Sequence, residues 1–178
     1  MKIITPRLTL RNWQQQDFKP FAILNHDPEV MKFFPKILNE EESNNAINKF
    51  IAHFEKHGFG LLAVERNDNK KFIGFIGLNI PNFTTNFTPC VEIGWRLAKE
   101  HWGQGLATEG ATAILQHAFD QLKLKEIVAF TAKNNLASIA VMKKIGMKRV
   151  IDGDFPHPNL PSNHALAPHI LYKINQPC

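Results

Sequence analysis

The spacing of hydrophobic positions along the chain predicts a single mixed α/β domain. Leu8 and Leu10 alternate with polar neighbours, which indicates an opening strand at residues 7–11. Further apolar runs indicate strands at residues 60–65, 72–78, 92–97, 126–132, 147–151 and 169–174. Apolar residues at helical spacing predict helices at residues 17–24, 40–56, 107–122 and 135–146. We expect an α/β fold in which about four helices flank a mixed sheet of about six to seven strands, with no domain boundary between residues 1 and 178.

A strand, a glycine turn and a helix follow one another between Glu92 and Glu109. The segment reads Glu92-Ile-Gly-Trp-Arg-Leu-Ala-Lys-Glu-His-Trp-Gly-Gln-Gly-Leu-Ala-Thr-Glu109, and the turn contains Gly103 and Gly105. A glycine turn that opens a helix leaves backbone N–H groups at the positive end of the helix dipole. Such amides bind phosphate or pyrophosphate, so the segment indicates a nucleotide-containing cofactor. The structural alternative is a plain strand-to-helix turn with glycines at positive φ.

Two common nucleotide-binding loops do not fit this turn. A Walker loop ends in Gly-Lys-Ser/Thr, whereas Gly105 is followed by Leu106 and Ala107. A dinucleotide-binding loop has a third glycine or alanine where this chain has Thr108, and it lies near the start of a βαβ unit. The turn here lies past the middle of the chain.

The segment from Trp102 to Thr108 resembles the pyrophosphate loop of the GNAT acetyltransferases, with the tryptophan in place of the usual Arg or Gln. The Trp-Gly-x-Gly-x-Ala-Thr-Glu form is typical of the ribosomal-protein-alanine N-acetyltransferase (RimJ/RimL-type) branch. Three other segments match the family in collinear order: Thr5–Trp13, Asp27–Met31 and Lys133–Met147. This resemblance implies a GNAT-type domain with splayed central strands that form the cofactor cleft, and acetyl-CoA as the co-substrate.

The resemblance also implies where acetyl-CoA binds. Its pyrophosphate is expected on the turn and its pantetheine arm along the strand that starts at Glu92, with Asn134 bonded to the pantetheine amides. As a plain turn residue, Asn134 would fit equally well. The expected cofactor-binding residues are Trp95, Arg96, Leu97, Trp102, Gly103, Gln104, Gly105, Leu106, Ala107, Thr108 and Asn134.

Acetyl transfer needs a neutral amine and a stabilised leaving thiolate. Glu92 is the candidate base, acting through a water, because it begins the strand beside the expected thioester. Ser138 is the candidate proton donor near the sulfur, by resemblance. Their structural alternatives are a solvent-facing carboxylate and an N3 helix residue with a local backbone bond. Cys90 and the terminal Cys178 are not placed to act as nucleophiles, so direct transfer is expected.

The acceptor site is expected after the first helix, where the GNAT family builds it. The candidate acceptor residues are Phe33, Phe34, Phe83 and His164, with Phe87 on the same rim as Phe83. Core packing is the alternative for the phenylalanines, and an ordinary surface role for His164. The spacings of His157, His164 and His169 match no zinc motif, so no metal is expected.

Composition agrees with an enzyme of the cytoplasm. Of the 178 residues, 44% are hydrophobic, and no apolar run reaches the ~20 residues that span a bilayer. Two cysteines are too few for a disulfide framework. The net charge of +5 comes from scattered lysines and arginines and forms no basic stripe, so neither nucleic acid nor membrane is expected as a partner. We expect a monomer or homodimer.

The sequence therefore predicts an N-acetyltransferase that moves acetyl from acetyl-CoA to a primary amine, for which a protein N-terminal α-amine is one class of acceptor. An acetyltransferase of a small amine, such as a polyamine, an amino sugar or an amino acid, is the alternative among enzymes. A non-catalytic sensor that binds acyl-CoA is the alternative outside enzymes.

Overall fold

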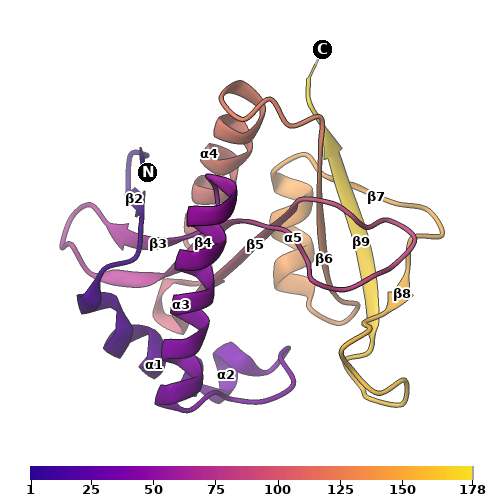
Figure 1. Ribbon diagram of the computed structural model, residues 1–178, viewed down its shortest axis with the longest axis horizontal. Coiled ribbons are helices and arrows are strands. Elements are labelled where there is room, and N and C mark those ends of the chain that lie inside the picture. The colour runs from indigo at the N-terminus through magenta and orange to yellow at the C-terminus, as the bar shows by residue number, and fades with distance from the viewer. Residues whose placement is uncertain (178) are drawn as a thin grey trace.

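The computed structural model describes residues 1–177 and forms a mixed sheet with helices on both faces (Figure 1). The sheet runs in the order β1-β2-β3-β4-β5-β6-β9-β7, and β8 pairs with β9. The strands are β1 (Lys2–Ile4), β2 (Leu8–Arg11), β3 (Leu61–Arg66), β4 (Phe72–Asn79), β5 (Glu92–Leu97), β6 (Glu126–Ala132), β7 (Lys148–Arg149), β8 (Phe155–Pro156) and β9 (Pro168–Asn175). The helices are α1 (Phe18–His26), α2 (Pro28–Met31), α3 (Glu40–His57), α4 (Leu106–Asp120) and α5 (Leu136–Lys144).

Two hydrophobic cores lie on the two faces of the sheet. One core lies under α4 and α5 and includes Ile93, Leu97 and Ile127. The other lies under α1 and α3 and includes Phe21, which packs edge-on against Phe75 with ring centroids 6.0 Å apart. Because strand side chains alternate between faces, β4 contributes to both cores, with Ile76 in the first and Phe75 in the second.

Helix α4 approaches the sheet closely because small residues face it. A Cβ at Gly110 would lie 2.5 Å from Ile76 Cδ1, so glycine permits this distance between helix and sheet. The close approach fixes the start of α4 beside the end of β5.

Strands β5 and β6 are parallel but pair at a single position, Glu92 opposite Val128. Strand β5 is instead fully paired with β4, from Gly74 opposite Leu97 to Asn79 opposite Glu92. The edge of β5 that faces β6 is therefore open beyond Glu92, and the expected splay of the central strands is confirmed.

The strand count differs from the expectation of about six to seven strands. The seven expected strands are present, and residues 1–177 contain two more, β1 and β8. Both are short: β1 adds to the edge at β2, and β8 pairs with two residues of β9 inside the loop expected between residues 152 and 168. Short edge strands take their form from the partner strand and carry little periodic signal of their own.

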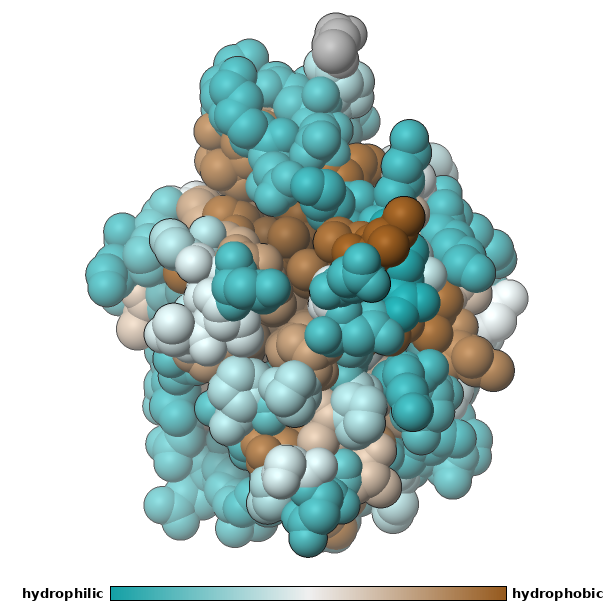
Figure 2. All heavy atoms as spheres, turned by 90° about the vertical axis from the view of Figure 1, so that its right-hand side faces the viewer, coloured by the Kyte–Doolittle hydropathy of each residue, from teal (hydrophilic) through white to brown (hydrophobic). Residues whose placement is uncertain are grey.

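The surface beside β9 is mostly hydrophilic, with apolar surface gathered between polar residues in the upper half of the view (Figure 2). Within the described part of the chain, no helix combines the length and the apolar character that crossing a membrane requires.

Candidate active site

The glycine turn before α4 leaves this helix without a side-chain cap. Gly105 is the N-cap with φ 76°, and Gly103 has φ 72°, both in the left-handed region that favours glycine. Among residues 1–177, no side chain caps the first turn, and a Cβ at Gly103 would meet nothing within 4 Å. The amides of the first turn therefore have no capping side chain and are available to an anion.

Two arginines that sequence reasoning missed flank this turn. Arg7 Nη1 donates to the Gln104 carbonyl at 2.8 Å, and Arg66 Nη1 donates to Gln104 Oε1 at 3.2 Å. Arg7 Nε also donates to Glu109 Oε2 at 2.6 Å. Arg66 is likewise ion-paired with Asp68, so both guanidinium groups lie beside the turn with a carboxylate partner in the protein. No spacing in the sequence indicated these two residues as part of the site. Arg7 lies on the loop before β2, and Arg66 is the last residue of β3.

The backbone of β5 alternates between the β4 side and the open edge. The Ala98 amide donates toward β4, to the Ile73 carbonyl at 2.9 Å, whereas the Val91 carbonyl accepts from Val128 of β6 at 2.9 Å. Amide and carbonyl of one strand residue point to the same side, and the side alternates along the chain. The β5 residues whose backbone groups face the open edge are therefore Ile93, Trp95 and Leu97.

This alternation separates the three backbone contacts expected on β5. Trp95 and Leu97 lie on the open edge, but the amide and carbonyl of Arg96 point toward β4, where Phe75 is its partner. The expected backbone contact of Arg96 with the cofactor does not fit this geometry. Trp102 Nε1 donates to the Leu97 carbonyl at 2.8 Å, so the indole closes the end of the open edge.

The carboxylate of Glu92 lies where β5 and β6 part. Asn79 Nδ2 donates to Glu92 Oε2 at 3.5 Å across the β4–β5 pair. Burial raises the pKa of Glu92 to about 7, and the hydrogen bond from Asn79 only partly opposes this rise. A carboxyl group that titrates near neutral pH is suited to general-base work.

The side chains of Glu92 and Arg96 lie on one face of β5, with Gly94 between them. Arg96 is opposite Phe75, which belongs to the core under α1 and α3, so this face is the α1–α3 face. The ring of Phe34, which follows α2, lies with its centroid 3.9 Å from Arg96 Cζ. One of the residues expected at the acceptor site is thus in contact with the strand that carries the candidate base.

A family model for the acetyltransferase (GNAT) domain matches residues 7–148. The chain belongs to the GNAT acetyltransferase family. The N-acetyltransferase YnaD of Bacillus subtilis is 32% identical over 151 residues, which cover 84% of this chain and 84% of the relative. Members of this family take acetyl from acetyl-CoA, and the chain is an acetyl-CoA-dependent N-acetyltransferase.

Solved GNAT structures share the whole fold. A GNAT acetyltransferase from Bacillus anthracis superposes with a TM-score of 0.81 at 27% identity, over 99% of each chain. The ribosomal L7/L12 α-N-protein acetyltransferase RimL, in complex with coenzyme A, has a TM-score of 0.79 at 16% identity over 98% of each chain. The family expected from the sequence is confirmed, and the likeness to RimL is one of fold.

The residues of this GNAT chain fit acetyl-CoA at two places. The uncapped turn at Gly103 and Gly105 offers amides to a pyrophosphate. The open edge of β5 offers the backbone groups of Trp95 and the Leu97 amide to an extended amide-containing arm. Leu106 is the first residue of α4 and its side chain is buried, so only its backbone is available there.

The segment before α5 is organised by Asn135 rather than by Asn134. Asn135 Oδ1 accepts from the Ser138 amide at 3.3 Å, and Asn135 Nδ2 donates to Thr131 Oγ1 at 3.0 Å. Asn134 is exposed, and Ser138 is half-buried at the N3 position of α5. Asn135 is thus the N-cap of α5, whereas the roles of Asn134 and Ser138 toward the cofactor stay predictions.

The other expected acceptor residues make contacts different from those of Phe34. Phe33 lies beside Lys32, whose Nζ is 5.2 Å from the ring centroid. Phe83 packs edge-on against Phe130 of β6, with centroids 5.7 Å apart. His164 Nδ1 accepts from the Leu166 amide at 3.1 Å, which organises its own loop.

An aromatic cluster brings Phe83 and Phe87 together with β6, β8 and β9. Its members, linked by ring centroids 4.8–6.4 Å apart, are Phe83, Phe87, Phe130, Phe155, His157 and His169. Phe130 follows Val128 by two residues and so shares the face of β6 on which Val128 lies beside Glu92. Both the core-packing and the acceptor interpretation of Phe83 remain compatible with this position.

The described cysteine is unsuited to nucleophilic catalysis. Burial, together with the charges of Glu92 and Glu126, raises the pKa of Cys90 to about 11, so its thiol stays protonated at neutral pH. Cys178 lies outside the described residues. Within residues 1–177, no group of three or more His, Cys, Asp or Glu residues could hold a metal ion.

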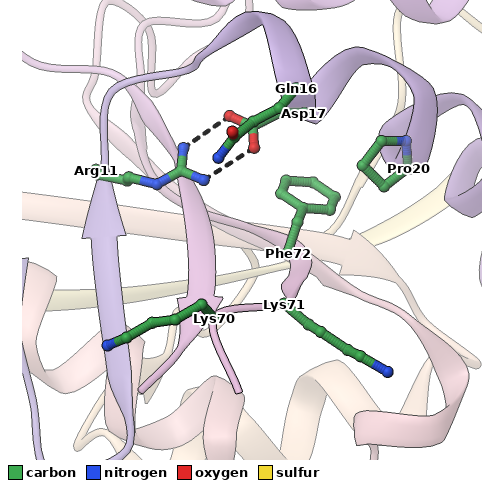
Figure 3. Close-up of a pocket in the computed structure, with 7 residues that line it drawn as sticks. All are labelled: Arg11, Gln16, Asp17, Pro20, Lys70, Lys71 and Phe72. Atoms are coloured by element: carbon green, nitrogen blue, oxygen red, sulfur yellow. Dashed lines mark hydrogen bonds and ion pairs between the residues drawn. The ribbon is translucent and has the colours of Figure 1, made fainter. Parts of the chain in front are cut away.

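A cavity of about 430 Å³ lies away from these groups, between β2, α1 and the β3–β4 hairpin (Figure 3). Its walls carry Arg11, whose guanidinium donates to both carboxylate oxygens of Asp17 at 2.7 and 2.9 Å. Arg11 Nη2 also donates to Glu65 at 3.1 Å. The hydrogen bond and charge of Asp17 raise the pKa of Arg11 despite its burial. This arginine is fully neutralised by the protein.

Proposed function

We propose that this GNAT enzyme transfers acetyl directly from acetyl-CoA to a primary amine on the α1–α3 face of β5, with Glu92 as the general base. The supporting observation is the position of Glu92 at the single β5–β6 contact, where the open edge begins. Its carboxyl group has a pKa near 7, so a large fraction is ionised at neutral pH.

Acetyl-CoA supplies the activated acetyl group as a thioester. In the proposed reaction the new N–C bond forms while the C–S bond breaks, Glu92 takes the proton that the amine loses, and the thiolate takes a proton. The Trp95 amide points to the open edge and is a donor for the carbonyl oxygen that becomes negative. Ser138 is the proposed proton donor to the sulfur.

A protein N-terminal α-amine is the proposed acceptor group. An α-amino group has a pKa of about 8, against about 10.4 for a lysine side chain. A single carboxylate with a pKa near 7 can therefore deprotonate an α-amine far more readily than a lysine. The fold likeness to RimL, whose name describes α-N-acetylation of a protein, supports this choice.

Calorimetric titration with acetyl-CoA, CoA and NADH tests the cofactor part of the proposal. We expect binding of acetyl-CoA and CoA, no binding of NADH, and loss of acetyl-CoA binding in Gly105→Glu, which places a carboxylate at the turn. Absence of acetyl-CoA binding to the unaltered protein would disprove the assignment of the turn.

Transfer assays with peptide N-termini, free lysine and small amines test the acceptor part. We expect transfer to α-amines and a loss of rate in Glu92→Gln. Binding of acetyl-CoA without transfer to any amine would favour the non-catalytic sensor instead.

A further inference from the structure

Arg11 is buried and Arg96 is half-buried on the α1–α3 face of the sheet, but the protein neutralises only one of them. Arg11 is bonded to Asp17 and Glu65. Arg96 has no carboxylate within 4 Å among residues 1–177. We propose that Arg96 binds a carboxylate of the acceptor, so that the amine acetylated by this enzyme belongs to a molecule that also carries a carboxylate. This inference rests on the proposed function.

The Arg96 side chain is held from three directions by groups that carry no negative charge. Nη1 donates to Oδ1 of Asn25, a fully buried residue of α1. The ring centroid of Phe34, on the loop after α2, lies 3.9 Å from Arg96 Cζ. The ring centroid of Phe75, on β4, lies 5.3 Å from the same atom. These contacts fix the plane of the guanidinium and leave its charge uncompensated.

The guanidinium also lacks hydrogen-bond partners. Nε is buried and makes no hydrogen bond in the described structure. Most buried polar groups have a partner, because an unpartnered one has lost its water without compensation. Burial lowers the pKa of Arg96 to about 9, the opposite direction from Arg11. The Arg96 guanidinium therefore lacks both a hydrogen-bond acceptor for Nε and a negatively charged partner in the described structure.

A carboxylate supplies both of these missing features. The planar fork of an arginine pairs with two carboxylate oxygens, and a pair of this kind is about twice as strong as a neutral hydrogen bond. The side chain remains partly accessible to solvent, so an incoming group can reach it.

The position of Arg96 places such a carboxylate in the acceptor region. Arg96 and Glu92 lie on the same face of β5, four residues or about 13 Å apart along the strand. Gly94 between them carries no side chain, and a Cβ there would meet only ordinary contacts at 3.9 and 4.0 Å. In the proposed complex the acceptor lies along this face with its amine toward Glu92 and its carboxylate toward Arg96.

The same charge disfavours one of the alternative acceptors. A polyamine is a polycation, and it would bring further positive charge to a cation that has no counterion. An amino acid, or a peptide with an acidic side chain near its N-terminus, brings the opposite charge.

The test uses pairs of acceptors that differ only in the carboxylate. In one set, each free amino acid is paired with its amide. This set includes amino acids that differ in the number of carbon atoms between the amine and the carboxylate. The other pairs peptides with Glu or Gln at the second position. We expect the unaltered enzyme to prefer the acid member by about 10- to 100-fold in kcat/KM, after correction for the fraction of neutral amine. The set with the larger preference shows whether the carboxylate belongs to a free amino acid or to a peptide.

Arg96→Met should lower the kcat/KM of the acid members to that of their amides, mainly by raising KM for the acid members. Arg96→Lys should retain part of it, because the charge remains without the planar fork. Arg149→Met is the matched control: Arg149 is an exposed arginine on β7, ion-paired with Asp154, and its loss should leave the preference intact.

Two results would overturn the proposal: equal kcat/KM for acid and amide members with the unaltered enzyme, or an equal loss for both members in Arg96→Met together with a lower Tm. The second result would make Arg96 a structural support for Phe34. Titration of both members into the CoA complex gives the same comparison as a ratio of Kd values, without turnover. A failure of the proposed transfer is thereby distinguished from a failure of carboxylate binding.

Discussion

Two residues of β5 have pKa values displaced toward neutral pH in opposite senses. Burial raises the pKa of the Glu92 carboxyl to about 7 and lowers that of the Arg96 guanidinium to about 9. Each displacement means that the charged form is less stable in the folded protein than in water. Because the two groups are about 13 Å apart along the strand, they do not neutralise each other. Charges that folding leaves uncompensated mark groups that act on something else.

Replacing Glu92 by Gln keeps the size of the side chain and removes the base. We expect kcat to fall by about 100-fold or more, in the range that general-base catalysis contributes. In the unaltered enzyme kcat/KM should rise with pH through about 7, where Glu92 loses its proton, and this limb should be absent in Glu92→Gln. Rate profiles from pH 5 to 9 measure both effects, with a saturating α-amine peptide for kcat and a limiting concentration of it for kcat/KM.

The control for this substitution is Glu126→Gln. Glu126 begins β6, is exposed and is ion-paired with Lys173, so its change should leave the rate and the pH limb as they are. An unchanged limb in Glu92→Gln would assign the titration to another group.

Glu92→Gln should also make the folded protein more stable at pH 8. The folded pKa of about 7 lies above the ordinary glutamate value of 4.5, so the ionised form destabilises the fold above pH 7. We expect a gain of about 2 kcal/mol in the free energy of unfolding, reduced from the full shift because Glu92 is partly accessible. The gain should shrink as the pH falls from 7 to 4.5. Urea unfolding at pH 8 and pH 5 checks it, and equal stability at pH 8 would contradict the raised pKa.

At the scale of elements, the sequence predicted the parts whose signal is local. The glycines at 103 and 105 indicated a turn at positive φ followed by a helix, and both are found in the left-handed region. The strand expected at residues 92–97 is likewise found, as β5. Helix α2 was not expected, because its four residues are too few to show helical spacing.

Contacts between distant elements could not be predicted in this way. The hydrogen bond from Arg96 to Asn25 joins β5 to α1. The hydrogen bond from Arg7 to Gln104 joins the loop before β2 to the glycine turn. Asn79 meets Glu92 only because β4 and β5 pair in one particular register. A register or a helix–strand contact is a property of the fold, so a single sequence without that fold gives no position for the partner.

The glycine turn can be separated from its role in folding by a matched pair of substitutions. Gly103 and Gly58 have φ values of 72° and 74°, and a Cβ at either would meet nothing within 4 Å. Alanine should therefore destabilise the protein similarly at both positions, by about 1–2 kcal/mol. Only Gly103→Ala should weaken acetyl-CoA binding, by about tenfold, because its methyl group enters the space before the helix N-terminus.

Chemical unfolding measures the first effect in this pair and calorimetry the second. Gly58 ends α3, remote in sequence from the turn, so it controls for backbone strain alone. A similar loss of acetyl-CoA affinity in both variants would mean that the turn has no special part in binding.

The whole molecule carries a set of histidines that resist protonation. Burial is the main cause that lowers the pKa of each histidine in this set. The five histidines are His53, His101, His117, His157 and His169. His53 shows the structural reason: its Nε2 accepts from the Ile80 amide at 3.2 Å while Nδ1 lies 3.0 Å from the Phe59 carbonyl. Both contacts are satisfied together only by the neutral ring with its proton on Nδ1.

These histidines should make the protein less stable in mild acid. Below the ordinary histidine pKa of about 6.5 the unfolded chain binds protons that the folded chain does not, so the free energy of unfolding falls as the pH falls toward the lower folded values. Glu92 acts in the opposite sense, because between pH 7 and 4.5 the folded protein holds a proton on it that the unfolded chain does not. The observed slope is the difference between the two contributions.

Removing one contribution at a time reveals the other. Between pH 6.5 and 5, Glu92→Gln should lose stability more steeply than the unaltered protein, by up to about 1.4 kcal/mol per pH unit. His157→Gln combined with His169→Gln should lose it less steeply, since these rings lie 4.8 Å apart and the charge of one disfavours the other. Urea midpoints at half-unit pH intervals give all three slopes. Identical slopes would mean that neither the buried carboxylate nor the histidines have displaced pKa values, and the pH profile of activity would then need another explanation than Glu92.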